Sequence, residues 1–129
     1  MKRFEPPESE IAAPFWDATR ESRLVLQWCT DCERPIWYPR EVCPGCLGES
    51  LEWRDAGGGG VVYACTVEHK ASPPYVVALV ELDEGVRLLS NVVGCPPEQV
   101  AVGDRVQVTW EALSDGRGLP LFEPTERLN

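Results

Sequence analysis

The sequence predicts a mainly β protein in which an N-terminal helix and a small metal-binding ribbon precede a five-stranded barrel. Three observations support this fold class. Two Cys-x-x-Cys pairs lie close together in the first half, four consecutive glycines follow them, and five short apolar runs separated by turn residues fill the second half. We therefore expect three segments: a helical segment over 1–23, a zinc ribbon over 24–56 and an OB-fold barrel over 57–129.

The length and composition are those of a globular protein. The chain has 129 residues, of which 43% are hydrophobic and 26% charged, so it can form one compact unit or two very small ones. No run approaches the roughly 18 apolar residues of a membrane span, and the N-terminal MKRFEPPESE contains no apolar segment typical of a secretory signal. These features predict a cytoplasmic protein, in which reducing conditions disfavour structural disulfides.

The charge argues against a nucleic-acid partner. The formal net charge is −9, and neither half of the chain is basic: residues 1–56 hold 7 basic and 11 acidic side chains, and residues 57–129 hold 5 and 10. Nucleic-acid binding obtains most of its affinity from lysine and arginine contacts with phosphates. We therefore expect no nucleic-acid binding from either half.

The first element is predicted to be a short helix over 13–23. Pro14 suits the first turn of a helix, where its missing N–H is not needed. An apolar stripe at helical spacing is widened by Trp16 and otherwise consists of Phe15, Ala18, Thr19 and Ser22. Short strands are then predicted over 24–28, 35–39 and 51–55. Together these elements are too small to bury much apolar surface.

The glycine run at 57–60 is predicted to join two modules. A phosphate-binding loop would end in Gly-Lys-Ser or Gly-Lys-Thr and would open a helix, and the sequence has neither feature. We therefore expect a flexible or tightly bent connection at this point.

The second half shows only strand signals. Alternation is clean over 105–113, where Val106, Val108 and Trp110 are expected to point inward. The connection over 95–104 has room for one helical turn. Five short antiparallel strands in about 70 residues fit a small Greek-key barrel of the OB type. The predicted strands cover 61–70, 75–83, 86–93, 105–113 and 119–124.

The strand predicted over 75–83 is apolar on both faces. A barrel strand whose outer face meets water should alternate between apolar and polar side chains. We therefore expect the outer face to be covered, either by the N-terminal segments or by another protein. One face consists of Val76, Ala78, Val80 and Leu82, and the other of Tyr75, Val77 and Leu79.

The two Cys-x-x-Cys pairs are separated by ten residues. A redox pair usually opens a helix, whereas the first pair here follows a predicted strand, and Pro44 and Gly45 lie within the second pair. Two facing knuckles supply four thiolates at tetrahedral positions, as in a zinc ribbon or rubredoxin-like site. Metal binding is therefore favoured over a redox or disulfide role, and zinc over iron because no electron-transfer context is visible. Four protein ligands leave no position for substrate, so the site is expected to be structural.

The remaining candidate residues do not assemble a catalytic set. Cys65 and Cys95 are expected to be small buried side chains, and His69 would lie about 13 Å along a strand from Cys65, too far for a dyad. Trp37, predicted to be exposed between the knuckles, and Arg40 are candidate contacts with a ligand or a partner. We therefore predict no catalytic residue in this chain.

Several motifs resemble one protein family. PFWDATRESRLVLQWCTDC, YPREVCPGC, GVVYACTVEH, PYVVALVELDEGVRLLSNVVG, VGDRVQVTW and LPLFEP are similar to a bacterial and archaeal family long catalogued as a domain of unknown function. That family joins an N-terminal helix and a rubredoxin-like zinc ribbon to an OB-fold, and the resemblance covers residues 11–124. A glycine often follows the second cysteine in the family, where this chain has Glu33, a change that does not disturb ligation. The zinc ligands that the resemblance implies are Cys29, Cys32, Cys43 and Cys46.

The resemblance implies an acyl-CoA-associated accessory protein. Family members are similar to partners of thiolase-superfamily, lipid-transfer-type aldolases that shorten steroid side chains by cleaving a β-hydroxy acyl-CoA, and others accompany enoyl-CoA hydratases. In the aldolase pairing the catalytic groups lie on the partner, a dimer that would carry two copies of this chain. Tyr75, Val77 and Leu79 are then candidate contacts with that partner. Two alternatives stay open: a stand-alone acyl-CoA-binding module and a nucleic-acid-binding OB module.

Overall fold

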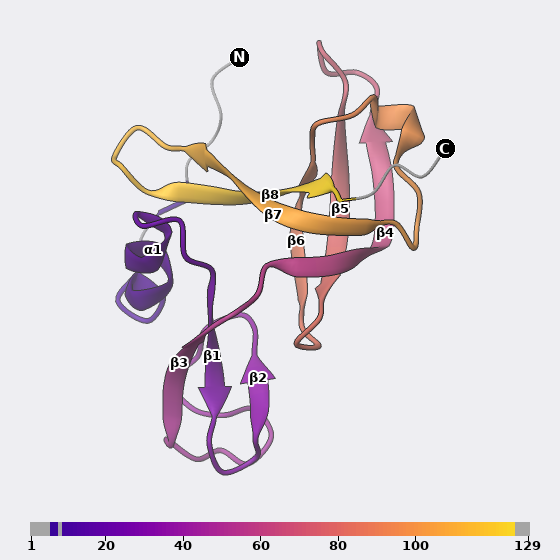
Figure 1. The fold of residues 1–129 in the computed structure, drawn as a ribbon. Coiled ribbons are helices and arrows are strands. Elements are labelled where there is room, and N and C mark those ends of the chain that lie inside the picture. The colour runs from indigo at the N-terminus through magenta and orange to yellow at the C-terminus, as the bar shows by residue number, and fades with distance from the viewer. Residues whose placement is uncertain (1–5, 8, 126–129) are drawn as a thin grey trace. The chain divides into compact units, whose positions relative to one another are not determined.

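The computed structural model of the chain describes residues 6, 7 and 9–125, which fall into two units. The first unit runs through Ala56 and also includes Glu111–Leu119, and the second comprises Gly57–Trp110 and the chain from Pro120 onward. Figure 1 labels the helix and the strands of both units. None of the helices in the described part of the chain has the length and hydropathy that a membrane crossing requires.

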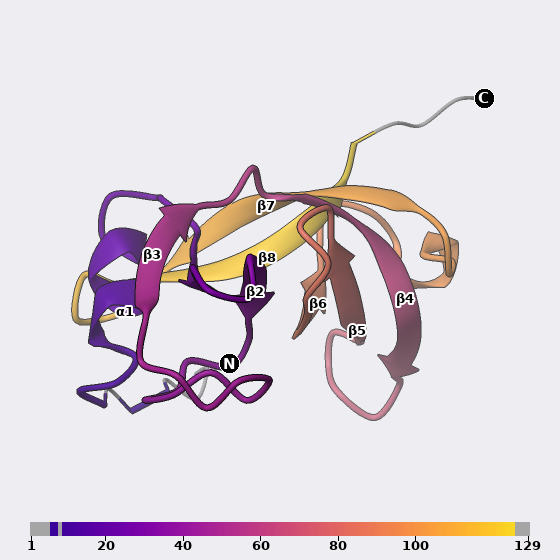
Figure 2. The same cartoon turned by 90° about the horizontal axis from the view of Figure 1, so that it is seen from below.

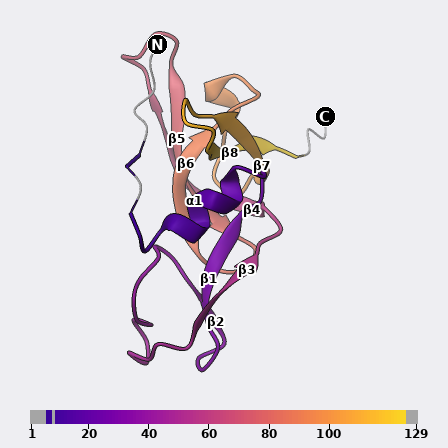
Figure 3. The same ribbon diagram turned by 90° about the vertical axis from the view of Figure 1, so that its left-hand side faces the viewer.

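The first unit contains one α-helix and a three-stranded antiparallel sheet (Figure 3). Its elements are α1 (Ala13–Thr19), β1 (Val25–Cys29), β2 (Arg34–Ile36) and β3 (Leu51–Asp55). Strand β1 lies at the centre of the sheet, where Cys29 is opposite Arg34 of β2 and opposite Leu51 of β3. The three short strands predicted for this region are therefore present, and β3 has the predicted bounds.

Helix α1 ends at Thr19, before the predicted end at residue 23, while Pro14 occupies its first turn as expected. The chain leaves the helix through a Schellman motif, in which the Arg23 N–H bonds the Ala18 carbonyl at 3.0 Å and the Ser22 N–H bonds the Thr19 carbonyl at 3.0 Å. Ser22 adopts φ 57 in this motif. It is exposed for that reason and does not join the apolar stripe that its spacing suggested.

The segment Glu111–Leu119 belongs to the first unit, although most of the second unit precedes it in the chain. The Gly118 N–H donates a hydrogen bond to Thr19 Oγ1 at 3.1 Å, and Arg20 Nη1 donates one to the Asp115 carbonyl oxygen at 2.6 Å. These bonds hold the end of α1, a helix too short to be stable by itself in water. The sequence offers no signal for this connection, and the three segment boundaries predicted above stay predictions.

Arg117 is a buried charge within this connection, with 4% of the residue exposed. Its guanidinium lies over the ring of Trp16, 4.8 Å from the centroid. Nε donates to Asp115 Oδ2 at 2.8 Å, and Nη2 donates to the Pro6 carbonyl oxygen at 2.8 Å. Hydrogen bonds from the Arg117 backbone and side chain lower the pKa of the Asp115 carboxyl. One side chain therefore ties together three separate parts of the first unit.

The second unit is a closed barrel of five strands (Figure 2). Its elements are β4 (Gly59–Glu68), β5 (Tyr75–Leu82), β6 (Arg87–Val92), the 3₁₀ helix η1 (Pro97–Gln99), β7 (Arg105–Ala112) and β8 (Gly118–Pro124). The strand order is β4-β5-β6-β8-β7, and β4 pairs with β7 to close the barrel. The OB-fold barrel predicted from the sequence is therefore confirmed.

One seam of the barrel differs from the prediction of an entirely antiparallel set. Strands β6 and β8 pair in parallel, with Val92 opposite Phe122. The reason is topological, since β7 lies between them in the chain. Strand β7 runs opposite to β6, and β8 runs opposite to β7, so β8 has the same direction as β6. The helical turn allowed between β6 and β7 is present as η1.

The barrel core comes from alternating side chains, as the pattern of β5 predicted. Val76, Ala78, Val80 and Leu82 are buried, and their neighbours on the other face are less buried. In β7, Val106 is fully buried as predicted, whereas Val108 and Trp110 are only partly buried. The other buried apolar residues of the barrel are Val62, Leu88, Val92, Leu121 and Phe122.

Two glycines of the run 57–60 belong to the barrel wall. Gly59 and Gly60 begin β4 and are buried there. A Cβ on Gly60 would lie 2.5 Å from the Glu81 carbonyl oxygen, so the neighbouring strand leaves no room for a side chain. Gly58 has φ 85, which side chains rarely adopt.

Candidate metal centre and the exposed strand face

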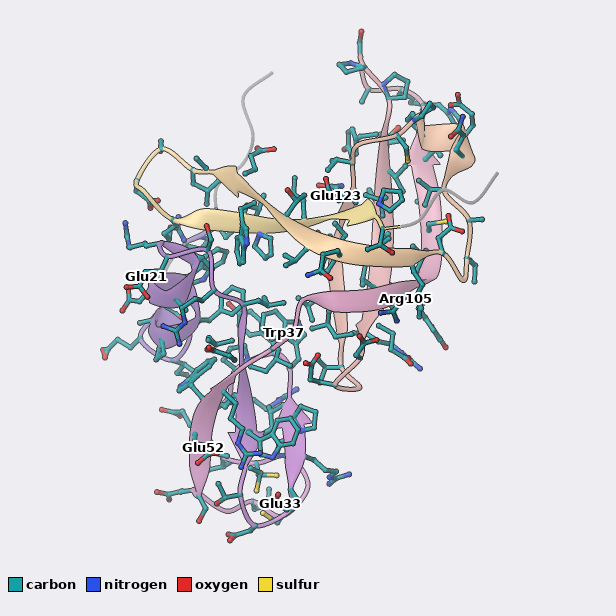
Figure 4. The ribbon with its side chains drawn as sticks, viewed as in Figure 1. Glu21, Glu33, Trp37, Glu52, Arg105 and Glu123 are labelled. Carbon is teal, nitrogen blue, oxygen red and sulfur yellow. The ribbon has the colours of Figure 1, made fainter. Side chains whose placement is uncertain are left out.

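Four cysteines of the first unit come together at one end of the ribbon. Their sulfur atoms all lie within 4.8 Å of one another, with Cys29 Sγ 3.7 Å from Cys46 Sγ and Cys32 Sγ 3.8 Å from Cys43 Sγ. Four sulfurs placed tetrahedrally at about 2.3 Å from a zinc ion would be roughly 3.8 Å apart. The cluster therefore fits a metal ion of this kind. Figure 4 shows the sulfur atoms in yellow beside Glu33.

The backbone of each Cys-x-x-Cys pair turns sharply to aim its sulfurs. The Cys32 N–H points at Cys29 Sγ from 3.3 Å, and the Gly45 N–H points at Cys43 Sγ from 3.3 Å. In each knuckle the residue after the second cysteine is left-handed: Glu33 has φ 55 and Leu47 has φ 62. Glycine adopts this conformation without strain, whereas Glu33 and Leu47 carry side chains in it.

The geometry favours metal binding over the two alternatives. A disulfide needs sulfurs about 2.05 Å apart, and all six cysteines are free. A redox pair usually opens a helix, and within residues 9–125 neither pair does so. Hydrogen bonding with the Cys46 and Cys43 thiols raises the pKa of Cys32 to about 12, and backbone N–H groups of Cys46 and Gly45 lower the pKa of Cys43 to about 6. A divalent cation would remove this difference between the cysteines, because it would bind all four sulfurs as thiolates.

The sulfur cluster also supplies part of the core of the first unit. Cys29 and Cys43 are buried together with Ile36, and Cys32 and Leu51 pack against them. Cys46 is exposed, so the cluster lies at the edge of the unit. The metal centre and the apolar core of the ribbon are therefore the same group of residues.

Trp37 does not lie exposed between the knuckles, and that prediction is wrong. The ring is half-buried and packs edge-on against Phe15, with the centroids 5.0 Å apart, and against Tyr38 at 5.2 Å. Helix α1 supplies Phe15, so the ring serves the core of the first unit. Tyr38 is the exposed aromatic at this place, with 49% of it exposed.

Arg40 lies on the surface at a fixed position. Its backbone N–H donates to Gln27 Oε1 at 2.8 Å, and Gln27 Nε2 donates to its carbonyl oxygen at 2.8 Å. Gln27 is itself buried, so the pair holds the loop after β2 against β1. The same residues line a hollow of 610 Å³ together with Ile11, Glu41, Val42, Glu49 and Leu51.

The outer face of β5 is partly exposed. The sequence analysis did not identify Leu89, the exposed apolar residue beside it in β6. Tyr75 is 39% exposed, while Val77 and Leu79 are half-buried. Leu89 lies opposite Leu79 and is 73% exposed. The signal for Leu89 was its position after Leu88, because adjacent residues of a strand face opposite sides and only Leu88 faces the core.

The other two cysteines and His69 lie in the second unit. Cys65 and Cys95 are half-buried, and Cys65 Sγ lies 4.0 Å from the Val100 carbonyl oxygen. His69 is exposed just beyond the end of β4.

Two family models match consecutive parts of the chain. The model described as ChsH2, rubredoxin-like zinc ribbon domain, matches residues 16–52, and the one described as ChsH2, C-terminal OB-fold domain, matches residues 53–111. The chain therefore carries a zinc ribbon domain whose four cysteines can hold a metal ion.

Curated relatives include both short and long proteins. The chain is 33% identical over 99 residues to a "DUF35 domain-containing scaffold protein" of Methanocaldococcus jannaschii, a match to 71% of this chain and 70% of that protein. It is 38% identical to a "Probable enoyl-CoA hydratase alpha subunit" of Thermomonospora curvata and 31% identical to the "3-oxo-4,17-pregnadiene-20-carboxyl-CoA hydratase alpha subunit" of Mycobacterium tuberculosis. Those matches cover 85% and 94% of this chain but 36% and 40% of the two relatives.

A solved structure matches along almost the whole chain. It is titled "Ltp2-ChsH2(DUF35) aldolase", and the match has a TM-score of 0.85 and 35% identity over 95% of this chain and 100% of that chain. The agreement extends through the ribbon and the barrel alike. This chain belongs to the ChsH2 (DUF35) family, in which a rubredoxin-like zinc ribbon precedes an OB-fold domain.

Proposed function

We propose that this chain is a non-catalytic subunit of an enzyme complex that acts on an acyl-CoA. One observation carries the proposal. This chain matches the full length of a chain in the solved structure titled "Ltp2-ChsH2(DUF35) aldolase". Two other relatives are named as alpha subunits of CoA-ester hydratases. Because both names describe a subunit, we expect this chain also to work beside a second polypeptide.

The reaction we favour is the retro-aldol cleavage of a β-hydroxy acyl-CoA on a thiolase-superfamily partner. In that reaction a base takes the proton of the β-hydroxyl group, the Cα–Cβ bond breaks, and its electron pair passes into the thioester enolate, which is then protonated. The partner would supply the base and the proton donor. Steroid side-chain degradation is the favoured context, because one relative is named for a pregnadiene carboxyl-CoA.

A hydratase is the second candidate partner, since two relatives carry that name. The chain spans 36% and 40% of those proteins. The two candidates differ in product: a hydratase adds water across a carbon–carbon double bond, whereas an aldolase releases a carbonyl fragment. Product analysis therefore separates them.

We further propose that Cys29, Cys32, Cys43 and Cys46 bind one structural Zn²⁺. With all four positions taken by protein, zinc would supply a cross-link between β1 and the second knuckle, and no Lewis-acid position for substrate. Structural zinc in small domains contributes an apparent binding free energy of about 10–16 kcal/mol. A unit whose core consists partly of the sulfur cluster itself would depend on that contribution.

The contact with the partner is proposed to lie on the outer face of β4, β5 and β6. Leu79 lies between Ala64 of β4 and Leu89 of β6, so apolar side chains form a row across three strands. Tyr75 and Val77 extend the row along β5. Exposed apolar patches on proteins of this size usually mark interaction sites. A permanent interface would bury roughly 2,000 Å² or more and be mostly apolar at its centre.

Two residues of the ribbon are proposed as additional contacts. Arg40 projects from a backbone that Gln27 fixes on both sides, which limits the entropy lost when it binds. Trp37 would contribute only the part of its ring that Phe15 and Tyr38 leave uncovered. A thiolase-superfamily partner is expected to be a dimer, and two copies of this chain would then bind it symmetrically.

Co-expression with a thiolase-like protein encoded beside this chain tests the proposal. We expect the two to co-purify, the pair to cleave a β-hydroxy acyl-CoA, and this chain alone to turn over no CoA ester. If the thiolase-like protein is equally soluble and active by itself, the subunit assignment is wrong. If this chain cleaves the thioester unaided, the assignment of catalysis to the partner is wrong, and tight binding of CoA by this chain alone would favour a stand-alone module.

A charge on the proposed face gives a finer test. Leu89→Glu should weaken co-purification because it places an anion in the middle of an apolar interface. Val102→Glu is the matched control, since Val102 is 66% exposed in the same unit but lies outside the three strands. Equal loss of the complex in both variants would contradict the placement of the interface.

A further inference from the structure

Arg34 differs from three other arginines of the first unit in the partner it has. Arg23 pairs with Asp55 at 2.7 Å, Arg54 pairs with Glu52, and Arg117 pairs with Asp115 at 2.8 Å. Among the residues that the structure describes, no carboxylate lies within ion-pair distance of Arg34. Its guanidinium lies against Gly45 of the second knuckle instead.

The position of Arg34 in β2 places it beside both knuckles. It lies opposite Cys29 in the sheet, so the side chains of Arg34 and Cys29 leave the same face. In the second knuckle the guanidinium lies against Gly45, where a Cβ would be 2.3 Å from Nη2 and 3.6 Å from Cys43 Sγ. The cation therefore lies on the face of the sheet that carries the Cys29 side chain and against the second knuckle.

Space, and not backbone conformation, accounts for the glycine at position 45. Gly45 is not among the glycines with positive φ. An alanine could adopt its backbone conformation but would take the place of Nη2. The absence of a side chain at this position is what allows the guanidinium to reach the cluster.

The negative charge of a metal-loaded site would favour a cation at this position. One Zn²⁺ with four thiolates carries a net charge of −2, and the neighbouring Asp31 and Glu33 are also acidic. Hydrogen bonds between an arginine and an anion are about twice as strong as those between neutral groups. Second-shell partners of this kind typically change metal affinity by about 10–100-fold.

We propose that Arg34, seated over Gly45, is the counter-charge of the zinc–thiolate centre and slows both the release of the metal and the chemical modification of its thiolates. The proposal rests on the zinc site proposed above. Arg34 acts through the cysteines and is a positioning residue, because it does not itself bind the metal.

Zinc release from the purified full-length chain tests the proposal. After the metal content of each variant is measured, zinc is removed by an excess of a chromophoric chelator, and the cysteines are alkylated with iodoacetamide in a parallel reaction. Arg34→Met should release zinc about tenfold faster and be alkylated faster, and Arg34→Lys should restore part of the difference because it keeps the charge. Arg23→Met removes the same charge from the same unit, away from the sulfurs, and should behave like the parent chain.

Gly45→Ala removes the contact without removing the charge. The end of an arginine side chain can swing aside, so we expect this variant to fold, to retain zinc and to release it as fast as Arg34→Met. The double variant should be no faster than either single variant, since both remove one interaction. If a parent chain with one zinc per molecule releases it no more slowly than Arg34→Met, the role of Arg34 is disproved while the zinc site stands. A parent chain that binds no metal would overturn both.

Discussion

The two units of this chain are stabilised in different ways. Among the residues that the structure describes, the buried polar side chains are Thr19, Gln27 and Arg117, and all of them lie in the first unit. In the described part of the second unit the buried side chains are apolar, and backbone hydrogen bonds join neighbouring strands of the closed barrel. A unit with short strands therefore depends on specific cross-links, whereas a closed barrel can depend on burial of apolar surface.

The tryptophans make the two units separately observable. Trp16, Trp28, Trp37 and Trp53 lie in the first unit, and Trp110 lies in the second. Tryptophan fluorescence therefore follows mainly the first unit, while far-ultraviolet circular dichroism includes the barrel strands. A single free energy of unfolding describes one cooperative transition, so the two signals should be analysed separately for a chain with two units.

Loss of the metal centre is expected to have the largest effect. Cys43→Ser, or removal of the metal by a strong chelator, should unfold the first unit, because structural zinc contributes an apparent ~10–16 kcal/mol in small domains. Fluorescence should shift toward that of exposed tryptophan, while the strand signal of the barrel persists. Cys95→Ser is the matched control, since Cys95 is half-buried outside the cluster. Loss of both signals together would show that the barrel needs the ribbon in order to fold.

A cavity in the barrel should give the opposite pattern. Phe122 is fully buried, and Phe122→Ala should destabilise the second unit by about 3–5 kcal/mol. In urea the strand signal should then be lost at a lower concentration, while the zinc content and the tryptophan fluorescence change little. Release of zinc at the same urea concentration as the loss of strands would contradict independent unfolding of the two units.

Local patterns in the sequence were sufficient for most of the fold and for the cysteine cluster. Strand β7 was found from its alternation, and the cluster was found because Cys-x-x-Cys knuckles are local turns with fixed ligand spacing. The end of α1 was missed because a Schellman motif at Ser22 uses a serine where glycine is the usual signal. Patterns of this kind describe residues close together in the chain.

Long-range contacts account for the rest. Arg117 lies between the last two predicted strands, and it is buried where its segment contacts Trp16. Trp37 was wrongly expected to be exposed for the same reason. Phe15, which packs against its ring, lies in another element, helix α1. Neither contact has a signal in the neighbouring residues.

Removal of the Arg117 guanidinium should have an intermediate effect, confined to the first unit. Arg117→Met keeps the packing on Trp16 but removes the hydrogen bonds to Asp115 and to the Pro6 carbonyl. One buried atom, Nη1, has no partner, which reduces the net loss. We expect about 1–3 kcal/mol, from the usual value of hydrogen bonds to charged groups. The measurement is the urea midpoint followed by fluorescence.

Arg54→Met is the matched control for that variant. Arg54 also stacks on a tryptophan of the first unit, at 4.6 Å from the Trp28 centroid, but its side chain is 39% exposed. Solvent already screens its ion pair with Glu52, so the change should be much smaller. Equal effects of the two variants would mean that burial of Arg117 adds nothing to its contribution.

The smallest expected effect is the pH dependence of the barrel. Arg105 Nη1 donates to Asp83 Oδ1 at 2.8 Å and Nη2 donates to Oδ2 at 3.1 Å, and this hydrogen bonding lowers the pKa of the Asp83 carboxyl in the folded state. A carboxyl with a lower pKa in the folded state adds stability above its unfolded pKa of about 3.9, and that stability is lost as the pH falls through the folded value.

In Asp83→Asn, the stability of the barrel should therefore fall less steeply as the pH drops below about 4. Its stability at neutral pH should be slightly lower than that of the parent chain. Both side chains are about half exposed, so solvent screens the pair and the effect at neutral pH will be small. The first unit should respond to acid sooner, because thiolate ligands must stay deprotonated to hold a metal. A titration followed by fluorescence and by circular dichroism should give two separate transitions, the first accompanied by zinc release. Coincident transitions in the parent chain and an unchanged acid limb in Asp83→Asn would show that the two units lose stability for the same reason.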